Sequence, residues 1–390
     1  MRIKRLPEDF RVEERICFPG DSGAFAYYRV EKEGMTTIAV RNAMAERLKV
    51  TPSALVFPAL KDKSAITVQY ASVRKQGPEE LHGRGFVAQR VGWGPRALRP
   101  RDLEGNQFEV VIRDLSEVEA RGFGATMLQL ETYGLPNYFD DQRFGSLTSD
   151  GFIGKEILKR DAEQVVRMYL AKAMVGDPRE IRQFKRLVAE HWGEWGFLLH
   201  QAPRPSNFRS VITYLKDHPN EYRKAANLIQ DRLLSIYLSA YQSWVWNEIV
   251  GAYIDQTLVP AARIRVMRGE FPVPEPDETM RELQTVLVEL PRLTACYEGP
   301  FEAVSAEVFE KEQLELREFK ARILRRVYLT KGERTVAFAP WGVSSEPPEP
   351  DALHSERWQV QVNFGLNAGQ YATLVLKSAA ALIGSSIRVR

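Results

Sequence analysis

A carboxylate lies between two lysines just ahead of an alternating stretch of sequence. Asp62 is flanked by Lys61 and Lys63. From residue 66 to residue 70 apolar and polar side chains alternate, which is the period-two pattern of a half-buried strand. Asp62 is therefore expected in a loop that a rigid strand positions, where catalytic groups are often found. The lysines would attract a polyanion and favour the ionised carboxylate, although a solvated turn would have the same three residues.

A second candidate site is the loop 134–145, which begins with glycine and proline. Asn137 and Phe139, with Tyr138 between them, supply an amide and two aromatic rings. Such a loop suits a pocket that stacks on a planar base and reads its edge. The structural alternative is a loop that ends a helix and buries its aromatic rings. A metal-dependent nuclease using Asp62, Asp140 and Asp141 is a rival, but no D-x-D or E-x-K cluster supports it.

Arginines are frequent between residues 84 and 113, where they are interleaved with Phe86 and Trp93. The candidates for RNA contact are Arg84, Arg90, Arg96, Arg99 and Arg101. Cations that alternate with aromatic residues can follow a nucleic-acid backbone. The same residues could equally be the solvated edges of strands, and the sequence leaves both interpretations open.

Composition bounds the class of protein. The 390 residues suffice for a large core and two domains, with 44% hydrophobic and 27% charged residues. The net charge of +3 does not by itself indicate a nucleic-acid-binding protein. Two distant cysteines and five scattered histidines predict a reducing compartment, no disulfide and no metal site. No apolar run approaches a membrane span and no export signal is visible, so a cytoplasmic protein without a membrane partner is expected.

The pattern of apolar residues predicts the main elements. A helix is expected from a threonine cap at Thr36 or Thr37 to about Lys49, and another over 116–132. Helical periodicity covers roughly 155–175, 179–192, 206–216 and 220–256, and a charged amphipathic helix is expected over 311–328. Residues 340–350 read as a connector without helical or strand pattern. Clean alternation over 358–364 predicts a strand.

The stretch from Lys61 to Gln69 resembles the K-D-[KR]-x-A-x-T-x-Q signature of the TruD family of tRNA pseudouridine synthases. Four further motifs resemble the family in its order. They begin at Lys4 (K-x-x-P-x-D-F-x-V-x-E), Leu103 (L-x-G-N-x-F-x-I-x-x-R), Gly134 (G-x-P-N-Y-F-G-x-Q-R-F-G) and Phe364 (F-x-L-P-x-G-x-[FY]-A-T). Ala240–Asn247 resembles a looser A-Y-Q-S-x-x-x-N segment, for which the role of a buried aromatic helix is favoured.

The resemblance implies roles for six residues. Asp62 falls on the family's essential catalytic aspartate, as nucleophile or general base, and Lys4 on the lysine that pairs with it. The residues that fall on the uridine pocket are Phe10, Asn137, Phe139 and Tyr371. Asp140 and Asn367 replace a glycine and a proline of the family pattern, and Pro58-Ala59 replaces Ala-Gly. All six residues are expected to line one concave site.

The implied fold is α+β: a pseudouridine synthase core, with a mixed and largely antiparallel sheet and helices, that carries an inserted α/β TRUD-type domain. Residues 1–150 and 341–390 would form the catalytic domain, and 151–340 the inserted one. The implied activity is isomerisation of uridine to pseudouridine in tRNA, at position thirteen as in the family's bacterial members, without a cofactor. A monomer acting on tRNA or another RNA is expected, and an RNA-binding protein of this fold without catalysis is the alternative.

Overall fold

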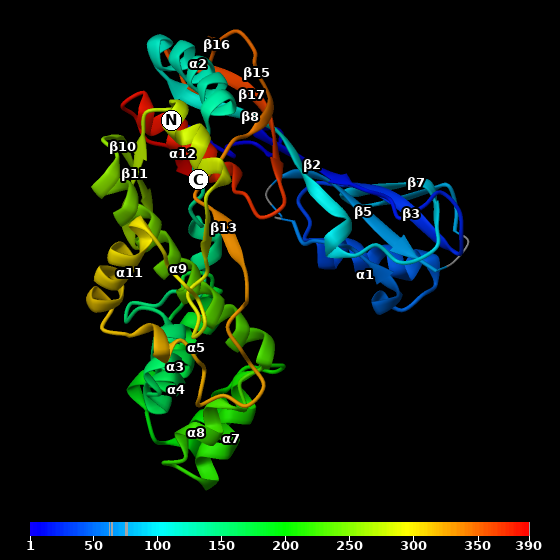
Figure 1. Ribbon diagram of the computed structural model, residues 1–390. Helices are drawn as coiled ribbons and strands as arrows, with labels where there is room; N and C mark the ends of the chain where they lie inside the picture. The colour runs from blue at the N-terminus through cyan, green and yellow to red at the C-terminus, as the bar shows by residue number, and fades with distance from the viewer. Residues whose placement is uncertain (62, 64, 75–76, 390) are drawn as a thin grey trace. The chain divides into compact units, whose positions relative to one another are not determined.

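The computed structural model describes residues 1–61, 63, 65–74 and 77–389 (Figure 1). The sequence motif around Asp62 is thus described on both sides of that residue, and Asp62 itself lies outside the described residues. Two compact units are present. The first comprises Met1–Pro136, Glu275–Gln284 and Ala337–Arg390, and the second comprises Asn137–Pro274 and Thr285–Val336.

A mixed sheet dominates the first unit and confirms the predicted α+β class. Along its main path the strand order is β15-β17-β8-β2-β5-β3-β7-β6. These strands are β2 (Phe10–Ile16), β3 (Phe25–Lys32), β5 (Ile66–Val73), β6 (Glu80–Gly83), β7 (Phe86–Gly94), β8 (Leu103–Leu115), β15 (Trp341–Ser345) and β17 (Trp358–Asn367). The pair β2–β5 is parallel and the other neighbouring pairs are antiparallel.

Short strands extend this sheet at several points. The four added strands are β1 (Arg2–Ile3), β4 (Leu55–Val56), β16 (Glu349–Pro350) and β18 (Arg388–Val389). A separate pair joins β9 (Leu135–Pro136) to β14 (Ala337–Phe338). The strands predicted from alternation at 66–70 and 358–364 are confirmed as β5 and β17. In register, Phe108 of β8 lies opposite both Val12 and Phe364, and its ring stacks on Phe364 with centroids 5.3 Å apart.

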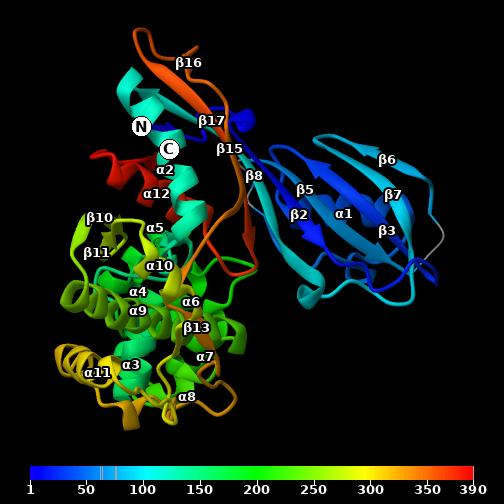
Figure 2. The ribbon, with the colours of Figure 1, turned by 45° about the horizontal axis from the view of Figure 1, so that its top comes forward.

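Helices cover the sheet where its apolar side chains need burial. Helix α1 (Thr37–Leu48) begins as predicted, because the Thr36 hydroxyl accepts the N–H of Ala39 at 3.2 Å. Figures 1 and 2 both show α1 beside β5 and β3, and its buried Val40 and Met44 join one cluster with Tyr28 of β3. The other helices of this unit are α2 (Glu117–Tyr133), α10 (Glu278–Glu282) and α12 (Ala372–Leu382).

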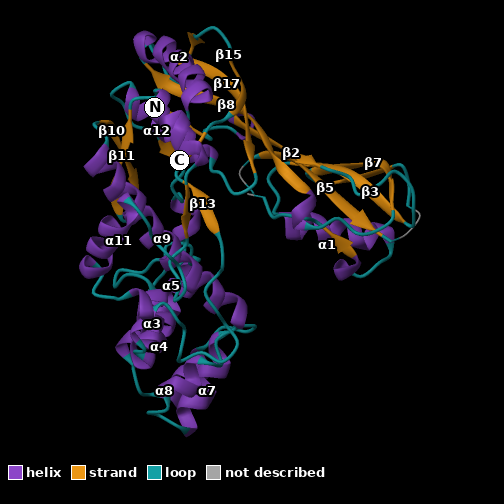
Figure 3. Ribbon diagram, in the orientation of Figure 1, coloured by secondary structure: helices purple, strands orange, loops and turns teal. Residues whose placement is uncertain are grey.

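The second unit is mainly helical (Figure 3). Its helices are α3 (Ile153–Lys159), α4 (Ala162–Ala171), α5 (Arg179–Glu190), α6 (Trp195–Gln201), α7 (Phe208–Asp217), α8 (Tyr222–Ala226), α9 (Asp231–Thr257) and α11 (Pro300–Lys311). Two strand pairs complete it: β10 (Pro260–Val266) with β11 (Gly269–Pro274), and β12 (Leu287–Glu289) with β13 (Glu333–Thr335). Helix α9 is its centre, with both Tyr241 and Trp246 fully buried.

Short 3-10 turns connect these elements. They are η1 (Pro7–Asp9), η2 (Pro52–Ala54), η3 (Pro100–Asp102), η4 (Asp141–Phe144), η5 (Leu283–Thr285) and η6 (Leu316–Glu318).

Two predicted elements were wrong. The expected helix over 311–328 does not form, because the chain leaves α11 with Gln313 in the left-handed region at φ 53° and continues as irregular structure. The expected connector 340–350 contains β15 and β16, which pair with β17 through backbone groups. Edge strands tolerate polar residues and proline, so no alternation was needed there. Two further expected helices are each divided in two. The helix expected over 155–175 is present as α3 and α4, and the helix expected over 220–256 as α8 and α9, separated by the turn 227–230.

Candidate functional site

Lys4 lies over the ring of Phe10. The two residues flank the turn η1, and the Lys4 ammonium is 4.2 Å from the Phe10 ring centroid. Phe10 opens β2, is only 5% exposed and contacts Phe108 edge-on. Lys4 has φ 59°, in the left-handed region that is uncommon for residues with a side chain. Such backbone strain is kept where surrounding contacts enforce it, and here the contacts come from Asp9.

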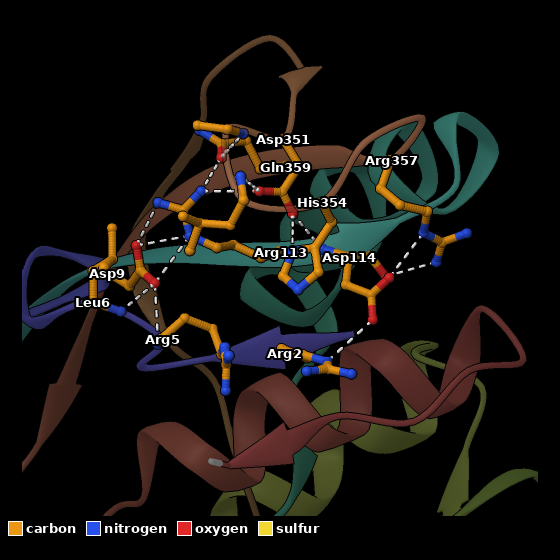
Figure 4. A network of polar contacts seen from close by, with 12 residues as sticks. Arg2, Arg5, Leu6, Asp9, Arg113, Asp114, Asp351, His354, Arg357 and Gln359 are labelled. Carbon is orange, nitrogen blue, oxygen red and sulfur yellow. Dashed lines mark hydrogen bonds and ion pairs between the residues drawn. The ribbon is translucent and has the colours of Figure 1, made fainter.

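Asp9 fixes the turn that carries Lys4. One carboxylate oxygen accepts the backbone N–H groups of Arg5 and Leu6 at 3.1 and 2.9 Å. The carboxylate also accepts from Arg113, whose Nη2 lies 2.7 Å from Oδ1 (Figure 4). Both side chains are almost fully buried. Asp9 and Arg113 come from two different sequence motifs, so this ion pair joins the opening segment to strand β8.

Asp351 completes the buried pair on the other side of the guanidinium. Arg113 Nη1 lies 3.1 Å from Asp351 Oδ1 (Figure 4). Burial alone would raise the pKa of Asp351, but the N–H groups of Leu353 and Asp114 and the side chains of His354 and Arg113 together lower it. The hydrogen bond to Asp9 raises the pKa of Arg113. This network is structural, and it holds the Lys4 turn in place.

The described residues beside Asp62 are also held. The backbone N–H of Lys61 donates to the Thr37 hydroxyl at 3.0 Å. Its ammonium lies 3.4 Å from Glu14 Oε1 and donates to Asn106 Oδ1. The Gln69 amide donates to the carbonyl of Ala59 at 3.0 Å. Lys61 directly precedes Asp62 in the chain, so these contacts hold the last described residue before it.

Glu14 is the buried centre of this second network. Its side chain is fully buried and accepts the N–H of Tyr70 at 3.0 Å and the amide of Gln69 at 3.4 Å. The Thr37 hydroxyl in turn donates to Gln69 Oε1 at 2.8 Å. Burial raises the pKa of Glu14, against the attraction of Lys61 and the hydrogen bonds. The network was visible only in part from sequence, since Glu14 and Gln69 are motif positions without an assigned role.

In the second unit, Asn137 and Phe139 share one arginine. Arg334 of β13 donates to the Asn137 backbone carbonyl at 2.6 Å and to its side-chain oxygen at 2.5 Å. The guanidinium carbon lies 4.4 Å from the Phe139 ring centroid. The Asn137 amide nitrogen donates to the Thr335 hydroxyl at 3.0 Å. Arg334 was missed from sequence, because nothing local in the sequence links it to a loop 197 positions earlier.

Helix α9 fixes the same loop through Asn247. Its side chain accepts the N–H of Phe139 and donates to the Phe139 carbonyl, both at 2.8 Å. The indole of Trp246 meets the Phe139 ring edge-on at 5.7 Å. Ser243 accepts from Arg143 at 3.0 Å. The segment Ala240–Asn247 is thus a buried aromatic helix, as expected, and in addition its polar side chains hold the loop that carries Asn137 and Phe139.

Tyr371 is the N-cap residue of α12 and is partly exposed. Its backbone carbonyl accepts the N–H of Leu374 at 3.1 Å. Lys4, Phe10 and Tyr371 belong to the first unit, and Asn137 and Phe139 belong to the second. Convergence of these residues with Asp62 in one concave site stays a prediction.

The predicted RNA-binding arginines differ in their surroundings. Arg96 makes two hydrogen bonds of 2.7 Å to Asp102 and thereby lowers the pKa of that carboxyl. Arg90 contacts the carbonyl of Gly77 and stacks over Trp93. The three others, Arg84, Arg99 and Arg101, are exposed. RNA contact by this set stays a prediction.

Other classes of site were also considered. Among the residues that the structure describes, no group of three His, Cys, Asp or Glu side chains is placed to hold a metal ion. Asp141 accepts the backbone N–H of Met267 at 2.6 Å. None of the helices in the described part of the chain combines the length and the hydropathy that a membrane span requires.

Comparisons with known proteins agree with the motifs. The family profile described as tRNA pseudouridine synthase D (TruD) matches residues 1–379. "Probable tRNA pseudouridine synthase D 1" of Methanococcus maripaludis is 29% identical, over 97% of this chain and 98% of that protein. The tRNA pseudouridine synthase D of Aquifex aeolicus is 26% identical, over 97% of both chains.

A solved structure shares the fold. The TruD crystal structure from Methanosarcina mazei has a TM-score of 0.73 and 21% identity, and the match covers 97% of this chain and 92% of that one. Because the family profile spans almost the whole sequence, the chain belongs to the TruD family of tRNA pseudouridine synthases, which are isomerases.

Proposed function

We propose that this enzyme converts uridine to pseudouridine at position thirteen of tRNA, with Asp62 as the essential carboxylate. The reaction breaks the glycosidic bond between N1 and C1′, turns the base and joins C5 to C1′, while C5 loses its proton and N1 takes one up. Bonds broken and formed balance within one nucleotide, so no redox carrier or second substrate is needed. Asp62 acts as the nucleophile or the general base of this isomerisation. Residues 1–150 and 341–390 carry catalysis, and 151–340 form the inserted domain.

The observation that carries the proposal is the buried network that holds the described residues just before Asp62 in the chain. Catalytic groups need a fixed geometry, and hydrogen bonds to the residues next to them in the chain help to provide it. Glu14 and Thr37 contact Lys61, and Gln69 contacts Ala59, at distances of 3.0–3.4 Å. Glu14 makes its contact from a fully buried position, where a carboxylate is costly to desolvate. A solvated turn would not require such a network. The ammonium of Lys4 would favour the ionised form of Asp62.

The target uridine must leave its stack to react, so the pocket needs flat walls and few polar contacts. In the proposal Phe10, Phe139 and Tyr371 supply the walls and Asn137 supplies an amide contact. The Asn137 side chain is already oriented by Arg334 and Thr335, which leaves a defined hydrogen-bonding edge rather than a free rotor. Such orientation lowers the entropy cost of binding the base.

The test uses the full-length protein and unmodified tRNA transcripts. Pseudouridine is mapped by chemical labelling and reverse-transcription stops, on a transcript with uridine at position thirteen and on one with cytidine there. The proposal expects one new pseudouridine that disappears with the cytidine transcript. Modification at another position would overturn the assignment of position thirteen. Binding without any modification would favour the alternative, an RNA-binding protein of the same fold without catalysis.

A further inference from the structure

A short segment of the second unit has an unusual charge. Residues 320–331, called here the basic segment, contain no Asp or Glu. Its five cations are Lys320, Arg322, Arg325, Arg326 and Lys331, and all five are exposed. The whole chain has a net charge of only +3. The formal charge of this twelve-residue segment is therefore larger than the net charge of the entire chain.

The backbone of the basic segment is held in place. Asn227, directly after α8, donates to the Ile323 carbonyl at 2.8 Å and accepts the N–H of Arg325 at 3.0 Å. Its apolar residues are buried: Ala321, Ile323, Leu324 and Val327 are each less than 10% exposed. Figures 1 and 2 show this orange stretch passing beside α8. The apolar side chains thus anchor an irregular segment and leave the cations on its outer side.

The surroundings of these five cations differ from those of other exposed arginines. In the part of the chain that the structure describes, none of the five forms an ion pair within 4.0 Å. The exposed arginines of β10 behave differently, since Arg263 pairs with Asp255 and Arg265 with Glu270. Five like charges within twelve residues repel one another in the free protein, and a polyanion would relieve that repulsion.

An exposed aromatic ring stands among these cations. Tyr328 is 77% exposed, and it lies between Arg326 and Lys331 in the sequence. Large aromatic side chains are usually buried more deeply, so an exposed one beside cations suggests a stacking partner. Unpaired bases stack on such rings while arginines and lysines contact the phosphates.

A membrane surface is the other polyanion to consider. Interfacial membrane segments present apolar side chains together with their cations. Here the apolar residues Ile323, Leu324 and Val327 are already buried inside the protein. The observations therefore favour RNA.

We propose that the basic segment is an RNA-binding surface, in which Arg325 and Arg326 contact backbone phosphates and Tyr328 stacks on an unpaired base. This inference rests on the proposed function, and it adds a substrate contact that none of the sequence motifs includes. It concerns binding and leaves the chemical step to the residues described above.

The experiment compares two double variants of equal charge change in the full-length protein. R325Q/R326Q removes two cations that form no ion pair with any described residue. The matched control R263Q/R265Q removes two exposed arginines of β10 that do form ion pairs, with Asp255 and Glu270. Affinity for the tRNA transcript is measured over a series of salt concentrations. R325Q/R326Q should weaken binding several-fold at low salt and reduce the slope of log affinity against log salt by about 1–2. It should raise KM and leave kcat at saturating tRNA unchanged, and the control should change neither.

Tyr328→Ala and Tyr328→Phe address the stacking separately. The alanine variant should weaken binding several-fold with an unchanged salt slope, because stacking is not ionic, and phenylalanine should retain the affinity. The inference is overturned if R325Q/R326Q binds like the wild type, or if R263Q/R265Q loses as much affinity and slope.

Failure of the proposed function gives a different pattern. If the wild type binds tRNA without modifying it and R325Q/R326Q still loses the salt slope, the isomerase proposal fails and the RNA surface stands. If the wild type binds no RNA, both are overturned. Anionic vesicles serve as the second probe, and tighter binding of vesicles than of tRNA would also overturn the RNA assignment.

Discussion

The side chain of Asn247 binds both the backbone N–H and the backbone carbonyl of Phe139. Its amide accepts the Phe139 N–H and donates to the Phe139 carbonyl, each at 2.8 Å. Both groups are buried, so no water replaces Asn247 without a change in packing. A residue 108 positions away therefore determines where the ring of Phe139 lies.

Replacing Asn247 should impair catalysis more than stability explains. Asn247→Leu removes the hydrogen bonds to two buried backbone groups, and each loss should cost about 1–3 kcal/mol in the free energy of unfolding. Gln242→Leu is the matched control, because Gln242 also lies buried on α9 and donates to two carbonyls, those of Pro291 and Thr330. Both variants should melt earlier, and only Asn247→Leu should lose tenfold or more in kcat/KM at a temperature where both are folded. Equal losses of activity would mean that Asn247 is purely structural.

Activity should depend on the planar guanidinium group of Arg334 and not only on its positive charge. It contacts two oxygen atoms of Asn137 and the face of Phe139, which the single ammonium of a lysine cannot reproduce. Arg334→Lys should lower kcat/KM by about 10-fold or more, since a hydrogen bond from a charged group contributes about 1.5–3 kcal/mol. Arg292→Lys, at a half-buried arginine paired with Glu289, is the control and should have little effect. If Arg334→Lys retained normal activity, the guanidinium contacts of Arg334 would not be required for the reaction.

The buried pair of Asp9 and Arg113 should matter for stability. Asp9→Ala leaves the guanidinium with Asp351 and removes its shorter contact, so it should lower the free energy of unfolding by roughly 3–5 kcal/mol. Glu117→Gln disrupts an exposed ion pair with Arg121 in the same unit, and its effect should stay below about 1 kcal/mol. Denaturant titration measures both. A similar small change in the two variants would show that the buried pair is replaceable.

The contribution of Glu14 to the free energy of unfolding should decrease as pH rises. Burial raises its pKa above the usual 4.5, so the folded protein keeps a proton that the unfolded chain has already released. The Glu14 contribution to the free energy of unfolding therefore falls as pH rises above about 4.5 and through the raised folded value.

Glu14→Gln removes this titration. The free energy of unfolding of the wild type minus that of Glu14→Gln should thus decrease between pH 4.5 and neutrality. Groups such as Asp351, whose pKa is lowered, contribute equally to both proteins and cancel. A difference that is flat with pH would show that Glu14 titrates as an exposed glutamate does.

The sequence predicted those parts of the fold that depend on local pattern. Alternation identified β5 and β17, and the Thr36 cap located the start of α1. Strands β15 and β16 were missed because an edge strand forms through backbone pairing, which leaves no side-chain pattern. The helix expected over 311–328 failed because its apolar residues are buried in an irregular conformation that only the tertiary structure supports.

In the candidate site, too, the sequence identified the residues that lie in motifs and missed those that only the tertiary structure brings together. The motifs led to Lys4 and Phe10, which do contact each other, and to Asn137 and Phe139 on one loop. They did not lead to Arg334, because its contacts with Asn137 join residues 197 positions apart and no spacing rule connects them. Asn247 was in a motif, yet its buried helix gave no indication that its side chain faces a distant loop.

The central claim is that Asp62 performs the isomerisation. The most direct measurement is pseudouridine formation on a single unmodified tRNA transcript by wild type and by Asp62→Asn, with tRNA affinity and thermal unfolding measured on the same preparations. The account predicts that Asp62→Asn binds tRNA and unfolds as the wild type does, while the rate of pseudouridine formation falls by ~10³ or more. Near-normal turnover by Asp62→Asn would contradict this claim. The carboxylate of Asp62 would then not be required for the reaction, and the network of Glu14, Thr37 and Gln69 would have only a structural role.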